Sequence, residues 1–216
     1  MCLTIFTITV AAYVQGGNMP DDHALIVAAE RNDATTVLRW LKTGANIHAR
    51  DDKGRTALLA ATTHNHIESA RLLIEAGADV NAQDDRLDSP LLLAGASGYL
   101  DILKLTLKAD PNFKVYNRFG GTALIPACER GHVDVVKELL KTEIDIDHVN
   151  NLGWTALLEA IILSDGGPKH QEIVRMLVSA GANVNLSDRQ GVTPLQHARR
   201  RGYREIVNVL ESHGAR

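Results

Sequence analysis

The chain has 216 residues, of which 45% are apolar and 23% charged, a composition typical of a folded globular protein and not of a disordered one. Its formal net charge of −3 argues against a broad basic surface for nucleic acid. Only 4% of the residues are aromatic, so the core must consist of small aliphatic side chains, which favours packed helices over an aromatic-rich β-sandwich. The two cysteines, Cys2 and Cys128, indicate neither a disulfide framework nor a metal cluster, and we interpret Cys128 as a small buried side chain.

Residues 1–17 form an apolar N-terminal segment that is distinct from the rest of the chain. Its apolar run, from Leu3 to Val14, is shorter than the ~20 residues that a membrane-spanning helix needs. The length suits an export signal, but no Lys or Arg precedes the run. Three interpretations remain open: a mis-assigned start with Met19 as the true first residue, a truncated or atypical export signal, and a terminal segment that packs on the fold.

From residue 18 to residue 216 the sequence repeats itself, which indicates a single domain of similar units. Thr56 begins the hexapeptide T-A-L-L-A-A, and comparable hexapeptides begin at Ser89, Thr122, Thr155 and Thr193. The first three intervals are 33 residues and the last is 38. The repeat predicts six units, at about 18–50, 51–83, 84–116, 117–149, 150–187 and 188–216.

Each unit is predicted to form a helix, a turn, a second helix and an extended loop. A Thr or Ser hydroxyl at the start of the hexapeptide can cap free backbone N–H groups, and Pro90 and Pro194 stand at the tolerated first helical position. Residues 133–140 show the apolar spacing of a second helix, and Gly77 suits a left-handed helix stop. One unit alone cannot bury its apolar face, so the units must stack. The prediction is an all-α protein.

The pattern resembles the ankyrin repeat over about residues 21–216. The resemblance implies a solenoid of about six helix-turn-helix units joined by hairpin-like loops, with partner binding as its role. The segment 153–170 is similar to small stand-alone bacterial ankyrin-repeat proteins. The usual His of the family's T-P-L-H motif is replaced in five units, which removes the hydroxyl–imidazole hydrogen bond that typically ties this turn. The replacing residues are Leu59, Leu92, Ile125, Leu158 and Gln196.

Three irregularities interrupt the repeat. Leu87 stands where other units have the turn glycine. Asp110 and Glu143 replace the helix-stop glycine, so we expect a less regular middle of the stack, and Glu143→Gly should be stabilising if Glu143 has left-handed angles. Five extra residues fall between Leu163 and His170. We expect this insertion to project from the helix–helix turn or to extend the first helix, and its deletion to leave the fold intact.

A search for chemistry finds no nucleophile elbow and no phosphate-binding loop. His64 and His66 are the best metal candidates, but they fall on a turn, and we assign them a local turn role. The basic run Arg199 to Arg201 is interpreted as a solubilising face on the last unit. We therefore expect no catalytic residue, no cofactor-binding residue, no metal site and no cofactor, and we expect that the protein is not an enzyme.

The loop tips change character along the chain, from charged residues in the early units to large apolar ones in units four and five. Because turn tips are normally polar, this change indicates either a contact patch for a partner or packing between neighbouring loops. Trp154 is the predicted hot spot of such a patch. The candidate partner-binding residues are Tyr116, Arg118, Phe119, Arg130, Leu152, Trp154, Ile162, Leu163 and Arg189.

These features favour a non-enzymatic scaffold or adaptor that binds another protein through its concave face and hairpin tips. The alternative is an exported accessory or regulatory protein that acts on a partner enzyme. We expect a monomer with a protein partner, no nucleic-acid partner and no stable insertion into a membrane. The expected location is the cytoplasm, or the periplasm or exterior if residues 1–17 belong to an export signal.

Overall fold

The computed structural model describes residues 22–216, and the interpretations of residues 1–17 and of Met19 lie outside this range. Within it the chain forms twelve helices and no strand, in agreement with the predicted all-α solenoid. The helices are α1 (Asp22–Glu30), α2 (Ala34–Lys42), α3 (Ala57–Thr63), α4 (Ile67–Glu75), α5 (Pro90–Ser97), α6 (Leu100–Lys108), α7 (Leu124–Glu129), α8 (Val133–Leu139), α9 (Ala156–Ile162), α10 (Pro168–Ser179), α11 (Pro194–Arg201) and α12 (Arg204–Ser212).

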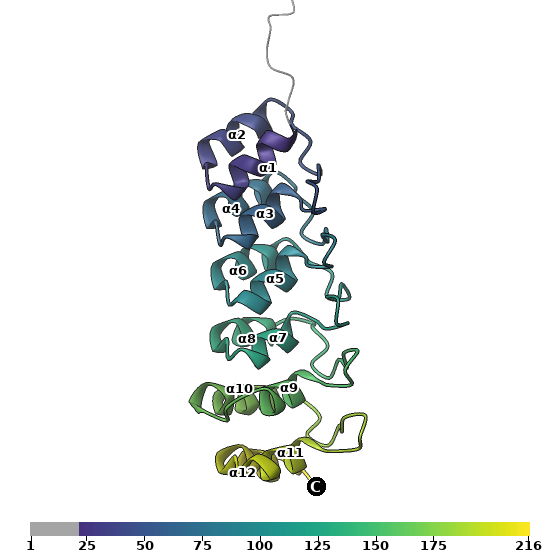
Figure 1. The fold of residues 1–216 in the computed structure, drawn as a ribbon. Coiled ribbons are helices and arrows are strands. Elements are labelled where there is room, and N and C mark those ends of the chain that lie inside the picture. The colour runs from purple at the N-terminus through teal and green to yellow at the C-terminus, as the bar shows by residue number, and fades with distance from the viewer. Residues whose placement is uncertain (1–21) are drawn as a thin grey trace, which may run out of the picture.

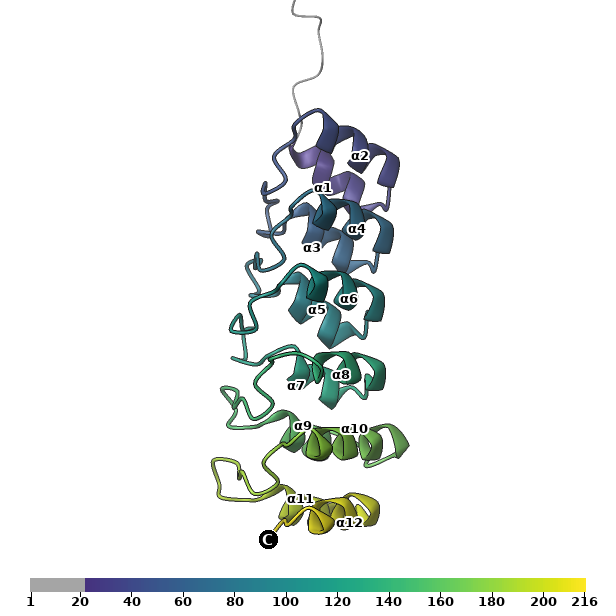
Figure 2. The ribbon, with the colours of Figure 1, turned by 180° about the vertical axis from the view of Figure 1, so that it is seen from behind.

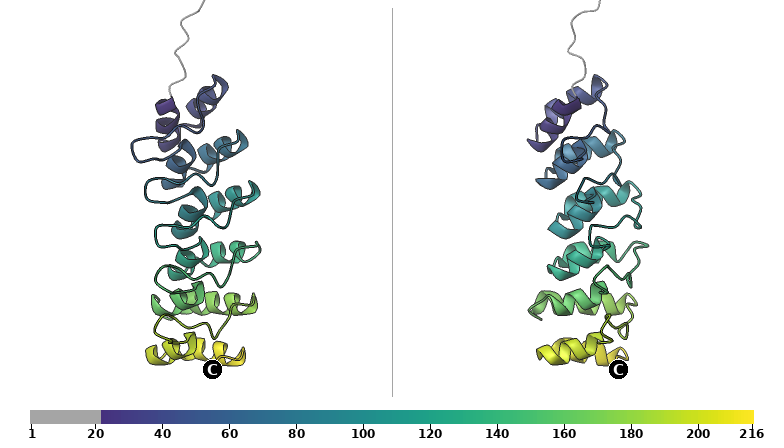
Figure 3. Two further views of the ribbon diagram at one scale, coloured as in Figure 1. Left: turned by 90° about the vertical axis from the view of Figure 1, so that its right-hand side faces the viewer. Right: turned by 45° about the vertical axis from the view of Figure 1, so that its right-hand side comes forward.

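The helices form six pairs that stack into an elongated array (Figure 1). The first helix of each pair lies in one column and the second helix in a parallel column (Figures 1 and 2). The loops that join one pair to the next all project on the same side of the array, which is the right-hand side in Figure 1 and in the right view of Figure 3. We call these segments the hairpin loops; they comprise residues 43–56, 76–89, 109–123, 140–155 and 180–193.

The core is continuous along the stack because equivalent positions of the first helices carry the same side chains. The leucine of each hexapeptide is at most 5% exposed, and the alanine three residues later is equally buried. A small side chain at this second position lets neighbouring first helices approach closely. The leucines are Leu25, Leu58, Leu91, Leu124, Leu157 and Leu195, and the alanines are Ala28, Ala61, Ala94, Ala127, Ala160 and Ala198.

Hydroxyl caps begin four of the first helices, as the sequence predicts. The side-chain oxygen of Thr56 accepts a hydrogen bond from the N–H of Leu59 at 3.3 Å, and Ser89, Thr155 and Thr193 act in the same way. The residue that replaces the family's histidine therefore still binds the cap, through its main chain. Gln196 adds a reciprocal bond from its side chain to the Thr193 N–H.

Unit four departs from this arrangement because of a proline. In the other capped units the N–H four residues after the cap binds the cap carbonyl, as in Ala60 to Thr56 at 2.9 Å. Pro126 occupies that position in unit four and has no N–H to donate. Helix α7 accordingly begins later, at Leu124. The buried hydroxyl of Thr122 is left without a hydrogen-bond partner in the described part of the chain.

The turn at the tip of each hairpin loop requires a left-handed residue, and in unit three that residue is leucine. Leu87 has φ = 60°, where Gly54, Gly120 and Gly153 have φ between 69° and 85°. A side chain in this region costs about 1–2 kcal/mol. We predict that Leu87→Gly raises the free energy of unfolding by about 1 kcal/mol, measured by urea denaturation. Leu87→Ala keeps the Cβ atom and should give no such gain; an equal gain from alanine would show that exposed apolar area, and not backbone strain, is relieved.

The helix-stop position shows why the middle of the stack is irregular. Gly44, Gly77 and Gly181 have the left-handed angles expected of them, and Asp110 adopts φ = 53° in their place. Glu143 is not left-handed. After α8 the chain instead continues in a tight turn, in which the Thr142 hydroxyl donates to the Leu139 carbonyl at 2.6 Å. The condition for a stabilising Glu143→Gly substitution is therefore not met.

The insertion forms the turn between α9 and α10 and also lengthens α10. Of the two expected positions, the helix–helix turn is confirmed and an extension of the first helix is wrong. Helix α9 ends at Ile162, whereas α10 runs over twelve residues from Pro168. A proline at the first helical position favours this early start. The inserted loop is packed on the next unit: the hydroxyl of Tyr203 donates to the Ser164 carbonyl at 2.6 Å, and the Tyr203 ring lies against Gly166. A five-residue deletion would therefore remove a contact between units as well as surface chain.

The prediction that Cys128 is a small buried side chain is confirmed. Cys128 is fully buried in α7, and burial raises the pKa of its thiol well above its usual value. None of the helices between residues 22 and 216 combines the length and apolar character that crossing a membrane requires.

Candidate functional site

The turns between paired helices are occupied by side chains that tie one unit to the next. His66 Nε2 donates to the Glu30 carbonyl at 3.0 Å, and His132 and His170 make the same bond to Ala96 and Glu129. These imidazoles satisfy carbonyl groups at the ends of first helices. The turn role predicted for His66 thus has a defined geometry. In the described part of the chain no group of three or more His, Cys, Asp or Glu side chains is arranged to hold a metal ion.

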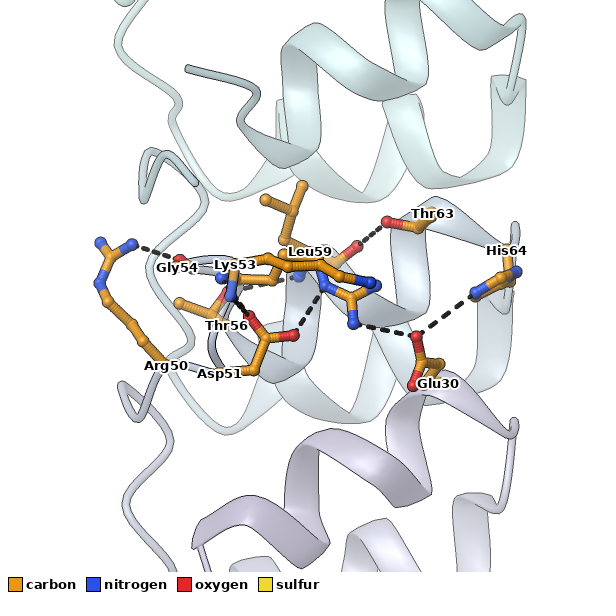
Figure 4. A network of polar contacts seen from close by, with 10 residues as sticks. Glu30, Arg50, Asp51, Lys53, Gly54, Thr56, Leu59, Thr63 and His64 are labelled. Atoms are coloured by element: carbon orange, nitrogen blue, oxygen red, sulfur yellow. Dashed lines mark hydrogen bonds and ion pairs between the residues drawn. The ribbon is translucent and has the colours of Figure 1, made fainter. Parts of the chain in front are cut away.

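A polar network joins the hairpin loop before α3 to helix α1 of the preceding unit (Figure 4). Arg55 pairs with Asp51 at 2.8 Å and with Glu30 of the preceding unit at 2.9 Å. The hydrogen bond from Arg55 lowers the pKa of Glu30, and His64 approaches the same carboxylate at 3.7 Å. The charged groups of Arg55, Asp51 and Glu30 therefore pair with one another.

On the hairpin loops, a second row of contacts runs from unit to unit. Arg50 Nη1 donates to the Gln83 carbonyl at 2.5 Å, and Gln83 Nε2 donates to the Tyr116 carbonyl at 2.8 Å. The Tyr116 ring stacks on His148 with centroids 4.4 Å apart. Tyr116 thus belongs to a row that joins adjacent hairpin loops.

Exposed apolar side chains concentrate on the hairpin loops of the middle units. Eight large apolar side chains are exposed among the described residues, and six of them lie on these loops or at the end of α9. The other two, Leu38 and Ile67, lie on second helices. Scattered exposed apolar residues need no explanation, but a gathered set indicates an interaction surface. The six are Leu87, Tyr116, Phe119, Val149, Leu152 and Leu163.

Three of these side chains border a cavity of about 290 Å³ that spans units three to five. The cavity lies between the hairpin loops and the ends of the first helices, and its lining combines apolar, cationic and acidic groups. The lining residues are Arg86, Asp88, Leu93, Ala96, Asn117, Arg118, Phe119, Gly121, Ile125, Pro126, Glu129, Arg130, Asn150, Leu152, Glu159 and Leu163.

Cationic and apolar groups of the cavity are exposed, and the acidic groups lie deeper. Arg86, Arg118 and Arg130 are exposed, as are Phe119, Leu152 and Leu163. By contrast, Asp88 and Glu129 are half-buried, and Glu159 is only 5% exposed. We call the six exposed residues the cavity rim and the three acidic residues the cavity floor.

Burial governs the electrostatics of the floor. Desolvation, together with a smaller effect of the nearby Glu129 charge, raises the pKa of Glu159 to about 7, although the hydrogen bond that Asn150 Nδ2 donates at 2.7 Å opposes the shift. Desolvation also raises the pKa of Asp88. The Asn150–Glu159 contact has a counterpart in unit six, where His197 Nε2 meets Asp188 at 2.7 Å. The Glu159 side chain therefore connects helix α9 to the hairpin loop that carries Asn150.

Five of the nine predicted partner-binding residues line the cavity: Arg118, Phe119, Arg130, Leu152 and Leu163. Tyr116 lies in the row of contacts that joins the hairpin loops, and the stem of Arg189 covers Gly153. Trp154 and Ile162 are half-buried and are not among the lining residues. The structure therefore brings one subset of the predicted residues together and separates the others from it.

Glu159 is the floor residue that the sequence interpretation missed. Arg86, Asp88 and Glu129 are at loop-tip and helix-end positions that the ankyrin resemblance places along the groove, although they are not among the nine candidate residues. Asp88 and Arg86 fall among other charged turn residues, where their pattern is ordinary. Glu159 gives a clearer signal, because the equivalent positions in units two to four hold Ala60, Leu93 and Pro126. A carboxyl group at a position that is apolar in units two to four indicates a buried polar contact.

The fold places the protein in a class: a solenoid of stacked helix pairs with projecting loops. Comparison of the sequence with protein families finds that residues 9–84 and 91–188 match a family model described as ankyrin repeats (3 copies), and residues 168–211 match one described as ankyrin repeats (many copies). The chain belongs to the ankyrin-repeat family.

Solved ankyrin-repeat structures share this architecture, and a curated relative is similar in sequence over part of its length. The crystal structure of an ankyrin repeat domain from Acinetobacter baumannii AYE is 55% identical, with a TM-score of 0.89 over 91% of this chain and 100% of that one. The ankyrin repeat protein EF0377 is 42% identical, with a TM-score of 0.86 over 88% of this chain and 98% of that one. The ankyrin-repeat protein YahD of Escherichia coli (strain K12) is 52% identical over 58 residues, which are 27% of this chain and 29% of YahD.

Proposed function

We propose that this protein is a non-enzymatic interaction module that binds another protein through the hairpin loops and the cavity rim of units three to five. Ankyrin repeats are in general protein–protein interaction modules, and their fold is a scaffold. The fold alone does not determine the role of this protein, because one fold can carry many functions. The observation that carries the proposal is the concentration of exposed apolar side chains on the middle hairpin loops.

The residue types on this surface and their exposure support binding to another protein. Exposed aromatic and arginine side chains beside apolar ones are the residue types that dominate the energy of protein interfaces. Phe119 and Leu152 are each about half exposed although neither is needed to fill the core. The guanidinium of Arg118 lies 4.6 Å from the centre of the Phe119 ring, which holds both side chains in place for a partner.

The proposal is tested by capture from a lysate of the source cells with three immobilised proteins. They are the unchanged protein, Phe119→Ser/Leu152→Ser, and the control Leu38→Ser/Ile67→Ser, which removes two exposed apolar side chains from second helices. We expect the unchanged protein and the control to enrich the same protein and the Phe119/Leu152 variant to lose it. Equal enrichment by all three proteins would show that this surface is not the binding site.

Trp154→Ala separates binding from stability at the predicted hot spot. The sequence places a tryptophan where other units have Arg55, Asp88, Gly121 or Val192, so the fold does not require an aromatic side chain there. We predict that the substitution weakens partner binding by about 2 kcal/mol or more and lowers stability by less. The measurements are the affinity for the captured partner and the urea midpoint.

The control for Trp154→Ala is Leu38→Ala. Arg55, the residue at the equivalent position of unit two, is not a suitable control because it forms ion pairs whose loss would disturb that unit. A large drop in the urea midpoint with unchanged affinity would mean that half-buried Trp154 only seals the contact between two units. In that case the cavity rim, without Trp154, is the binding surface.

A further inference from the structure

The cavity rim carries two guanidinium groups that form no direct ion pair with another described side chain. Among the described residues, neither Arg118 nor Arg130 has a carboxylate within 4.0 Å, and Arg86 approaches Asp88 only at 3.9 Å. Arg130 Nη1 donates to the Ala96 carbonyl at 2.6 Å, which fixes the side chain and leaves its other N–H groups free for a ligand. This contrasts with unit two, where Arg55 is neutralised by Glu30 and Asp51.

A partner meets the cationic rim before it meets the acidic floor. The three arginines and three apolar side chains of the rim are exposed, whereas Asp88, Glu129 and Glu159 lie below them. The floor carboxyls balance the guanidinium charges at long range without occupying their exposed donors. The exposed side chains that a partner meets first are therefore cationic and apolar, although the whole chain has a net charge of −3.

The size of the cavity limits what can enter it. A volume of about 290 Å³ is just below the roughly 300–1,000 Å³ found for ligand pockets, and it suits one or two side chains. Leu93, Ile125, Phe119 and Leu152 supply apolar lining, which favours an apolar side chain as the inserted group. Only three arginines surround the opening, too few for the extended phosphate contacts of nucleic acid.

We infer that the cavity rim binds an acidic segment of a partner protein, in which an Asp or Glu lies within a few residues of an apolar side chain. The apolar side chain enters the cavity between Phe119 and Leu152, and the carboxylate accepts hydrogen bonds from Arg118 and Arg130. This inference rests on the proposed function, because it names the chemistry of the partner at the same surface.

The test uses a displayed library of random peptides, selected on the unchanged protein, on Arg118→Gln/Arg130→Gln and on a control, Arg39→Gln/Arg204→Gln. Arg39 is matched to Arg118 because it also lies over an aromatic ring, at 5.3 Å from the centre of Trp40. We expect peptides with Asp or Glu beside Leu, Ile or Phe to be enriched on the unchanged protein and the control. The Arg118/Arg130 variant should lose the acidic preference.

A synthetic copy of the most enriched peptide then gives affinities. Loss of charge-assisted hydrogen bonds should weaken its binding to Arg118→Gln/Arg130→Gln by about tenfold or more. Arg86→Gln/Arg118→Gln keeps the Arg130–Ala96 bond and should also weaken binding, which guards against an effect of unfolding. Enrichment of basic or purely apolar peptides, enrichment of none, or equal affinity for all variants would overturn the inference.

The outcome also distinguishes this inference from the proposed function. If the library gives no acidic preference while capture from the lysate still depends on Phe119 and Leu152, the interaction module stands and the partner chemistry is wrong. If both fail, the surface is not a binding site.

Discussion

Replacing Glu159 by glutamine is expected to stabilise the protein at pH 8 and to change its stability little near pH 4. Glu159 is 5% exposed, and its pKa in the folded protein is about 7, against an ordinary value of 4.5. Between these two values the folded state holds the proton more tightly than the unfolded state. The free energy of unfolding therefore falls as the pH rises from about 4.5 to about 7 and stays low above this range.

Glutamine keeps the shape of the side chain and removes its charge. Its amide oxygen can still accept the hydrogen bond that Asn150 Nδ2 donates to Glu159. A raised pKa of this size corresponds to at most about 3 kcal/mol, so we expect a gain of about 1–3 kcal/mol at pH 8. Urea denaturation of both proteins from pH 4 to pH 8 measures the difference.

Glu205→Gln is the matched control, because Glu205 is exposed on α12 and lies outside the cavity lining. Its effect on the urea midpoint should be constant from pH 5 to pH 8. If Glu159→Gln also gave a constant effect, Glu159 would be ionised in the folded protein throughout this range. The floor of the cavity would then be more polar than its burial indicates.

Gly95→Ala is expected to destabilise the protein although alanine forms helices better than glycine. Gly95 lies within α5, where glycine costs about 0.5–1 kcal/mol relative to alanine. A Cβ atom at this position would lie 2.9 Å from both the Cβ atom and the carbonyl oxygen of Ala123 in the next unit. The main-chain oxygen cannot rotate away, so α5 and the start of unit four must separate.

Overpacking of this kind costs about 1–3 kcal/mol, which exceeds the gain in helix propensity. Ser97→Ala, at the end of the same helix, measures the effect of alanine away from this contact and should be nearly neutral. Because repeat units are coupled only to their neighbours, Gly95→Ala should also broaden the urea transition. A more stable Gly95→Ala protein would show that the two units can shift apart without loss.

The repeat itself could be predicted from the sequence because each unit meets the same local requirements. Thr56 and its equivalents cap a helix, Leu58 and Ala61 recur at the spacing of one buried helix face, and Gly77 ends a helix in the left-handed region. These are local properties of the backbone and of apolar periodicity. They determined the all-α stack of pairs without knowledge of any contact between units.

Contacts between units decided what local patterns could not. The inserted residues lengthen α10 and pack on Tyr203, because the next unit offers a hydroxyl and a ring at that place. Glu143 avoids the left-handed conformation because Thr142 satisfies the end of α8 in another way. Neither outcome follows from the length of the insertion or from the missing glycine alone.

In the candidate site, too, some features follow from the sequence and others only from contacts between units. The sequence determined that large apolar residues and arginines stand on the loop tips of units four and five, since turn residues can be recognised by their position in the repeat. Only the tertiary structure decided that Arg118, Phe119 and Leu152 share a cavity with Glu159, and that Trp154 does not line it. The physical reason is that the direction of a side chain on a loop depends on the neighbouring unit against which the loop packs, and residues 33 positions apart in the chain become neighbours only in the folded stack.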